Sequence, residues 1–164
     1  MWLRDQLPLD LPGIRVIIYG YDTTLINSHS FQDIDDIAVA FIRRLSSVRP
    51  AGLSRKPLVL LAHSLGGIVL KSAMLRLAGS GEYHQSLLKD VKCAFFFGVP
   101  SKGMRISHLM ALVEDQPNGT LIRNLSTGSD YLLNLGDKLS GVSLYRSIRL
   151  ISAYETETSA TVVV

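Results

Sequence analysis

The sequence predicts an α/β fold in which helices flank both faces of a mostly parallel sheet of about four strands. Four short apolar runs have the length of strands, and stretches with helical periodicity separate them along the chain. The two middle runs are almost continuously hydrophobic, as expected for parallel strands that are covered on both faces. Strands and helices that alternate in this way build parallel sheets through right-handed crossovers.

The four predicted strands are residues 14–19, 57–62, 91–97 and 147–153. The first ends at Gly20, and the fourth shows only a partly alternating pattern of apolar residues. Cys93 lies inside the third strand with Lys92 as its only basic neighbour. We therefore expect Cys93 to be a core residue rather than a nucleophile.

Helical patterns fill the intervals between these strands. Residues 31–48 carry one apolar stripe, and Ser30 and Asp33 have the spacing of a capping box at its start. Residues 67–78 are apolar nearly all round, so we expect this second helix to be buried. Weaker patterns predict further helices over residues 104–114 and 120–139.

The composition limits the class of protein. The chain has 164 residues, of which 47% are hydrophobic and 19% charged, and this balance favours one folded domain over a disordered chain. The net charge of +3 is too small an excess to indicate nucleic-acid binding. No Cys/His cluster has metal-binding spacing and no glycine loop has a phosphate-binding pattern. We therefore expect neither a metal nor a cofactor.

Targeting signals are also missing from the sequence. No apolar stretch approaches the ~20 residues that a membrane span requires, and the first residues lack the pattern of a signal peptide. The single cysteine excludes an internal disulfide and fits a reducing compartment. We expect an intracellular chain without a transmembrane segment, which is cytoplasmic unless it is attached to a membrane by other means.

The stretch that carries chemistry is Ala62-His63-Ser64-Leu65-Gly66-Gly67. Ser64 stands between a predicted strand and a predicted helix, with small residues two positions to either side. This is the G-x-S-x-G pattern of a nucleophile elbow with alanine at the first glycine position, and such a turn presents the serine hydroxyl at the carboxyl end of a strand. In an elbow the Leu65 N–H is one donor to an oxyanion. The alternative interpretation is a glycine-rich turn with an incidental serine.

This stretch resembles the GHSLGG motif of lipase-like α/β-hydrolases. Further segments occur in order along nearly the whole chain, namely Trp2-Leu3 with Leu7-Pro8, Tyr19-Gly20-Tyr21-Asp22, residues 96–104, and Tyr154-Glu155-Thr156. Together they resemble the fungal branch of the serine active site-containing protein family, a group of serine esterases. The resemblance implies an α/β-hydrolase-like fold, an acyl ester substrate, and an association with the membrane of mitochondria or of the endoplasmic reticulum.

The chain departs from that family in three ways. Relatives carry a His-Gly oxyanion loop ahead of the Trp2-Leu3 segment, and Ser101 stands where relatives have a histidine. The catalytic histidine of this fold follows the last strand, where this sequence has none. Residues 1–164 are therefore expected to form a single, partial α/β-hydrolase domain that lacks the catalytic histidine and one oxyanion donor, with neighbouring domains in a longer parent protein as an open possibility.

The remaining titratable residues leave the catalytic set open. Glu155 follows the last strand, where the fold places the acid that orients the histidine, although a solvated carboxylate in the tail is an equal interpretation. Asp22 is expected to cap the next loop or helix. The histidines are expected to be ordinary structural or surface residues, and they are His29, His63, His84 and His108. Of these, His84 is expected to lie in a polar loop.

A basic cluster lies at the end of the first predicted helix. It consists of Arg43, Arg44, Arg49, Arg55 and Lys56. We interpret it as a solvated helix end rather than as a site for lipid head groups.

Two functions remain open on the sequence. The first is a serine esterase of the lipase-like kind that acts on an acyl ester through Ser64, with Glu155 orienting a histidine. The second is a catalytically inactive, hydrolase-derived module that serves in interaction or signalling. Labelling of Ser64 by a serine-directed probe separates the two hypotheses.

Overall fold

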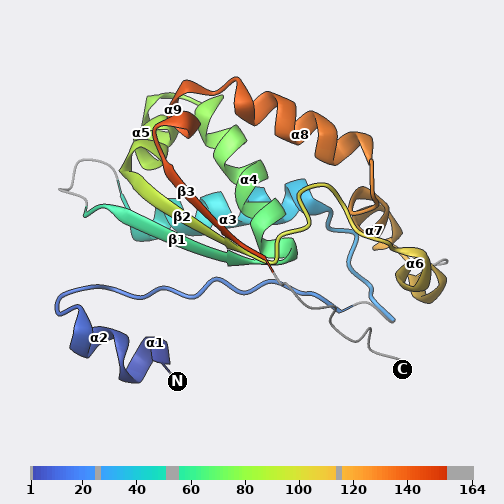
Figure 1. The fold of residues 1–164 in the computed structure, drawn as a ribbon, viewed down its shortest axis with the longest axis horizontal. Helices are drawn as coiled ribbons and strands as arrows, with labels where there is room; N and C mark the ends of the chain where they lie inside the picture. Colours follow the sequence, from blue (N-terminus) through green and yellow to red (C-terminus); the bar gives the residue numbers. More distant parts are fainter. Residues whose placement is uncertain (1, 25–26, 51–55, 114–115, 155–164) are drawn as a thin grey trace.

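The computed structural model describes residues 2–24, 27–50, 56–113 and 116–154. In this part of the chain three strands form one parallel sheet in the order β1-β2-β3, namely β1 (Leu58–His63), β2 (Val91–Phe97) and β3 (Arg149–Ala153). The helices are α1 (Trp2–Asp5), α2 (Leu7–Asp10), α3 (Ile34–Val48), α4 (Leu65–Ala78), α5 (Glu82–Asp90), α6 (Ser107–Val113), α7 (Gly119–Asn124), α8 (Asp130–Ser140) and α9 (Ser143–Arg146). The predicted α/β class is confirmed, and Figure 1 shows its layers.

The predicted first strand is wrong. Residues 14–19 carry no strand, and Ile18 is 68% exposed. A strand exists only where a neighbour accepts and donates its ladder hydrogen bonds, and among the described residues this segment has no such neighbour. It runs instead as an extended chain below β1 in Figure 1. The other three strands are confirmed, the last one two residues shorter because Ser147 ends α9.

The helices differ from the prediction at their ends. The first begins at Ile34 rather than at residue 31, because its capping box joins Asp33 to Asp36 and not Ser30 to Asp33. The Asp33 carboxylate accepts from the Asp36 N–H at 2.8 Å, and the Asp36 carboxylate accepts from the Asp33 N–H at 3.2 Å. The stretch 120–139 is interrupted between α7 and α8, where Gly128 has a φ of 73°.

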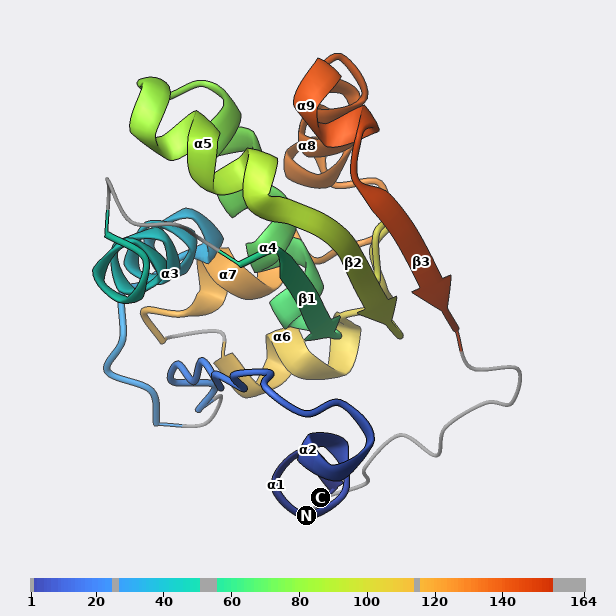
Figure 2. The ribbon, with the colours of Figure 1, turned by 90° about the vertical axis from the view of Figure 1, so that its left-hand side faces the viewer.

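Helices α3, α4, α5, α8 and α9 lie on one side of the sheet, whereas α1 and α2 lie on the other side, apart from the strands, and leave that face uncovered (Figure 1). Figure 2 shows α4 against β1 and β2. Helix α3 lies beside α4, and the helices α5, α8 and α9 lie above them in this view. Along β1, Leu60 and Ala62 pack toward this helical layer, while Val59 and Leu61 are 54% and 53% exposed. The sheet therefore has a packed face and an open face.

Two clusters of polar side chains connect the helices of this layer to one another. In the first, the Asp35 carboxylate of α3 accepts from Ser72 Oγ of α4 at 2.6 Å and from the Tyr131 hydroxyl of α8 at 2.9 Å, and it pairs with Arg76 at 2.9 Å. Burial opposes ionisation of this carboxylate, but the two hydroxyls and the Arg76 charge outweigh it, so the pKa of Asp35 lies below its ordinary value. Asp35 thus joins three helices.

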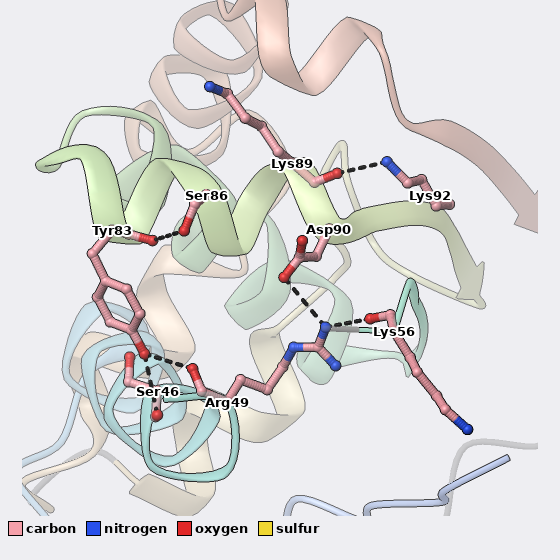
Figure 3. Close-up of polar contacts among 8 residues, drawn as sticks. All are labelled: Ser46, Arg49, Lys56, Tyr83, Ser86, Lys89, Asp90 and Lys92. Carbon is pink, nitrogen blue, oxygen red and sulfur yellow. Dashed lines mark hydrogen bonds and ion pairs between the residues drawn. The ribbon is translucent and has the colours of Figure 1, made fainter. Parts of the chain in front are cut away.

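The second cluster closes the end of α3 against α5 (Figure 3). Arg49, the residue after α3, pairs with Asp90 at 3.2 Å and also donates to the Lys56 carbonyl. The hydroxyl of Tyr83 lies 2.8 Å from the Arg49 carbonyl and 3.2 Å from that of Ser46. This arrangement fixes the chain that leads into β1, and Arg49 is therefore a structural member of the basic cluster.

Candidate functional site

Ser64 joins β1 to α4 in a strained backbone conformation. Its φ is 49° and its ψ is −128°, a combination that side-chain-bearing residues rarely adopt and that costs on the order of 1–3 kcal/mol. Hydrogen bonds hold the turn in place, since the Ser64 N–H donates to the Phe97 carbonyl at 2.9 Å and the Gly67 N–H donates to the Ser64 carbonyl at 2.9 Å. The serine thus sits at the carboxyl end of a parallel sheet and immediately before a buried helix.

The turn needs a glycine at position 67 more than at position 66. A Cβ on Gly67 would stand 2.7 Å from Val99 Cγ1 and closer still to Cγ2, which is nearer than real Cβ contacts. A Cβ on Gly66 would meet the Tyr21 hydroxyl oxygen at 3.6 Å, an ordinary contact distance. The close contact therefore lies at Gly67, against the loop that follows β2.

That loop, residues 98–104, is anchored to α4 by Lys71 and Ser101. The Lys71 ammonium donates to Ser101 Oγ at 2.5 Å and lies 5.2 Å above the centre of the Phe96 ring. Burial lowers the pKa of Lys71, because the charged form loses hydration. Ser101 is an exposed residue, and its hydrogen bond to Lys71 holds this loop against α4.

The predicted elbow residues occupy two elements and their junction. Ala62 lies in β1, Ser64 joins the strand to the helix, and Leu65, Gly66 and Gly67 begin α4. Glu155 lies outside the described residues. Asp22 accepts from the N–H and hydroxyl of Thr24, at 2.9 and 2.7 Å, and so caps a local turn as expected.

In the part of the chain that the structure describes, no histidine hydrogen-bonds to Ser64. His63 lies on the open face, and its Nε2 is 3.8 Å from where a Cβ on Gly98 would stand. The prediction for His84 is wrong, because this residue is on α5, the helix that leads into the amino end of β2. His108 is on α6, as the periodicity predicted, and His29 precedes α3.

Sequence reasoning gave no role to Tyr21, which the fold places against the elbow. Its hydroxyl oxygen is the atom that faces Gly66. Burial, and secondarily Tyr19, raises the pKa of Tyr21, so the phenol stays protonated at neutral pH. The only signal in the sequence was the Tyr-Gly-Tyr-Asp segment itself, which contributed to the family resemblance without indicating a contact with the elbow.

Two kinds of feature are absent from the residues that the structure describes. Within them, no three His, Cys, Asp or Glu residues gather as metal ligands would. No helix there combines the length and the hydrophobicity needed to cross a bilayer.

Comparison with known proteins supports a hydrolase relationship. No family model matches the chain. It is 25% identical over 159 residues to Protein SERAC1 of Mus musculus and 25% identical over 158 residues to Protein SERAC1 of Homo sapiens. These alignments cover 95% and 94% of the chain but 24% of each relative, so the chain spans about a quarter of the length of the curated relatives it matches.

A solved structure settles the fold. The mature lipase BlEst2 of Bacillus licheniformis superposes with a TM-score of 0.52 at 17% identity, over 74% of this chain and 47% of the lipase. The chain has an α/β-hydrolase-like fold. At this level of identity the likeness concerns the fold, and the chemistry has to be argued from the elbow itself.

Proposed function

We propose that the chain is a serine hydrolase domain of the esterase or lipase kind that acts on acyl esters through Ser64. The observation that carries this proposal is the backbone of Ser64, with its φ of 49° at the junction of β1 and α4. A strained serine in a strand-to-helix turn is the geometry of a nucleophile elbow. The lipase-like fold and the similarity to SERAC1 support the same assignment.

The proposed reaction uses groups at the start of α4. Ser64 Oγ attacks the ester carbonyl, the proton of its hydroxyl passes to a base, and the carbonyl oxygen becomes an oxyanion that accepts a hydrogen bond from the Leu65 N–H. The partial positive charge of the helix amino terminus favours this oxyanion. The alcohol then leaves with the proton, and water hydrolyses the acyl-Ser64 ester. In the proposal, Glu155 orients the histidine that acts as the base. None of the described histidines fills the role of this base.

A catalytically inactive module is the second candidate. The observation that favours it is the absence, among the described residues, of a histidine hydrogen-bonded to Ser64. Removal of a triad member leaves only ~10³–10⁴-fold catalysis over water. We therefore expect the 164-residue chain to turn over short activated esters at a rate close to that of its Ser64→Ala variant.

Covalent capture tests the nucleophile more directly than turnover. The 164-residue chain is incubated with a fluorophosphonate, and adducts are located by peptide mass spectrometry. We expect slow labelling at Ser64 that Ser64→Ala abolishes and Ser101→Ala leaves unchanged. A chain whose Ser64 reacts no faster than its other serines is an inactive module.

Location in the cell is part of the proposal only through the family resemblance. An association with the membrane of mitochondria or of the endoplasmic reticulum, and a fungal origin, both rest on it. Fluorescence microscopy of the tagged protein tests the first.

A further inference from the structure

A phenol hydroxyl beside the elbow has no partner within the described part of the chain. Tyr21 Oη lies 3.6 Å from the position of a Cβ on Gly66, two residues after Ser64. It makes no hydrogen bond there, whereas the neighbouring Tyr19 hydroxyl donates to the Ile37 carbonyl at 3.3 Å. A half-buried hydroxyl normally finds a partner in the protein or in water. The Tyr21 hydroxyl is therefore available to a molecule bound at the elbow.

The position of Tyr21 is fixed from both sides. Its ring lies 6.0 Å from that of Tyr19, which in turn meets Phe41 of α3 edge-on at 5.1 Å. On its other side the Asp22 carboxylate forms a turn with Thr24. Thus the segment that fails to form a strand is nevertheless held against α3 and α4 at the point where it passes the elbow. A group that stabilises a transition state has to be held in this way before the reaction begins.

We propose that the Tyr21 hydroxyl is the second oxyanion donor of the Ser64 site. This inference rests on the proposed function. As Ser64 Oγ bonds to the carbonyl carbon, the carbonyl oxygen gains the electron pair of its π bond and accepts hydrogen bonds from the Leu65 N–H and from Tyr21. The tyrosine proton stays on the phenol throughout, and collapse of the intermediate returns the electron pair to the carbonyl.

A chain without an efficient base makes the oxyanion contribution directly measurable, because residual reactivity then comes from the oxyanion hole and from binding. The rate constant for fluorophosphonate labelling of Ser64 is compared in the wild type, in Tyr21→Phe and in the matched control Tyr19→Phe. We expect Tyr21→Phe to slow labelling at least tenfold, since removal of one oxyanion donor costs ~10²–10³ in an intact enzyme. Tyr19→Phe is expected to stay within about twofold, because only its hydrogen bond to Ile37 is lost.

A spectroscopic readout separates a donor from a structural role. The phosphonyl oxygen of labelled Ser64 occupies the place of the oxyanion, so a hydrogen bond from Tyr21 changes its phosphorus NMR shift. We expect Tyr21→Phe, but not Tyr19→Phe, to move this resonance. The spectra are recorded on folded, labelled protein and so decide the point even where Tyr21→Phe lowers stability.

Two results overturn the inference, and they are distinguishable. If Tyr21→Phe labels at the wild-type rate with an unchanged phosphorus resonance, Tyr21 is no donor and the Ser64 hydrolase proposal stands. If Ser64 of the wild type is not labelled selectively, the proposed function and the role of Tyr21 fail together.

Discussion

Gly67 lies directly under the side chain of Val99. A Cβ on Gly67 would come within 2.7 Å of Val99 Cγ1 and 3.0 Å of Val99 Cβ. The first turn of α4 and the loop that follows β2 therefore touch backbone to side chain, and the Lys71–Ser101 hydrogen bond closes the same loop onto α4 four residues further along the helix. The elbow and this loop consequently behave as one packed unit.

We expect Gly67→Ala to lower the free energy of unfolding by about 1–3 kcal/mol. Valine is stiff at χ1 and cannot swing its methyl groups aside, so the added methyl group has to displace the loop. Denaturant unfolding measures the effect. The matched control is Gly136→Ala in α8, where a Cβ meets nothing within 4 Å and the change should stabilise by about 0.5–1 kcal/mol.

A double variant tests whether the contact with Val99 causes the loss of stability in Gly67→Ala. Val99→Ala removes both methyl groups that a Cβ at position 67 would meet. The double variant should recover part of the loss caused by Gly67→Ala, giving a coupling energy of about 0.5–3 kcal/mol. Strict additivity of the two changes would show that the contact is not the cause.

The backbone of Ser64 predicts an unusual order of stabilities. Ser64→Gly should be more stable than Ser64→Ala by about 1 kcal/mol, because glycine adopts a positive φ without strain whereas alanine keeps the strain of the serine. Thermal unfolding of the two variants measures the difference. In an ordinary turn or helix the order would be reversed, since glycine has more conformational entropy to lose.

The elbow could be predicted from sequence because its determinants are local. An apolar strand, a small-residue turn and an apolar helix follow one another within residues 58–78, so periodicity and a short motif are sufficient. The capping of α3 shows the limit even of local reasoning. Asp33 can pair with Ser30 or with Asp36 in a capping box, and only the residue at which the helix begins decides between the two. Helix α5 was missed because its buried face is reduced to Leu87 and Leu88.

The sequence could not show contacts between segments that are distant along the chain. Residues 14–19 have the composition of a strand, but strand formation depends on a neighbour that the segment itself does not specify. The contact of Tyr21 with Gly66, and that of Val99 with Gly67, join positions that are tens of residues apart. These contacts determine which glycine is constrained and which hydroxyl faces Gly66.

Asp35 should make stability sensitive to acid. Its folded-state pKa lies below the ordinary value of 3.8, so its contribution is present in full above that pH and is lost as the pH falls through the folded-state value. We expect Asp35→Asn to reduce the unfolding free energy by about 1–2 kcal/mol at pH 7, a range kept low because the carboxylate is partly exposed. The gap to wild type should shrink as the pH falls below 3.8.

A matched control keeps this result specific. Asp137→Asn changes an exposed carboxylate on α8 and should alter stability by less than about 0.5 kcal/mol at any pH. Chemical denaturation between pH 2 and 8 measures all three proteins. A gap between Asp35→Asn and wild type that is independent of pH would mean that Asp35 acts only through the shape of its hydrogen bonds and not through its charge.

The open face of the sheet presents exposed apolar side chains from two neighbouring strands. Val59 and Leu61 of β1 are both more than half exposed, and on β2 the rings of Phe95 and Phe97 stack 6.2 Å apart beside them. Register places Leu61 opposite Phe95, so these side chains form one continuous apolar surface. Contiguous apolar surface of this kind drives association.

We therefore expect the 164-residue chain to self-associate through this face and Leu61→Lys to weaken the association. Burying one leucine contributes about 1.5–3 kcal/mol, so the change should raise the dissociation constant at least tenfold in sedimentation velocity. Leu133→Lys is the matched control, because Leu133 is 57% exposed on α8, away from the sheet, and carries the same substitution and charge. Equal effects of the two variants would show that net charge governs association. A wild type that remains monomeric at high concentration would show that the open face does not drive self-association. Leu61 would then be an ordinary exposed residue without a role in assembly.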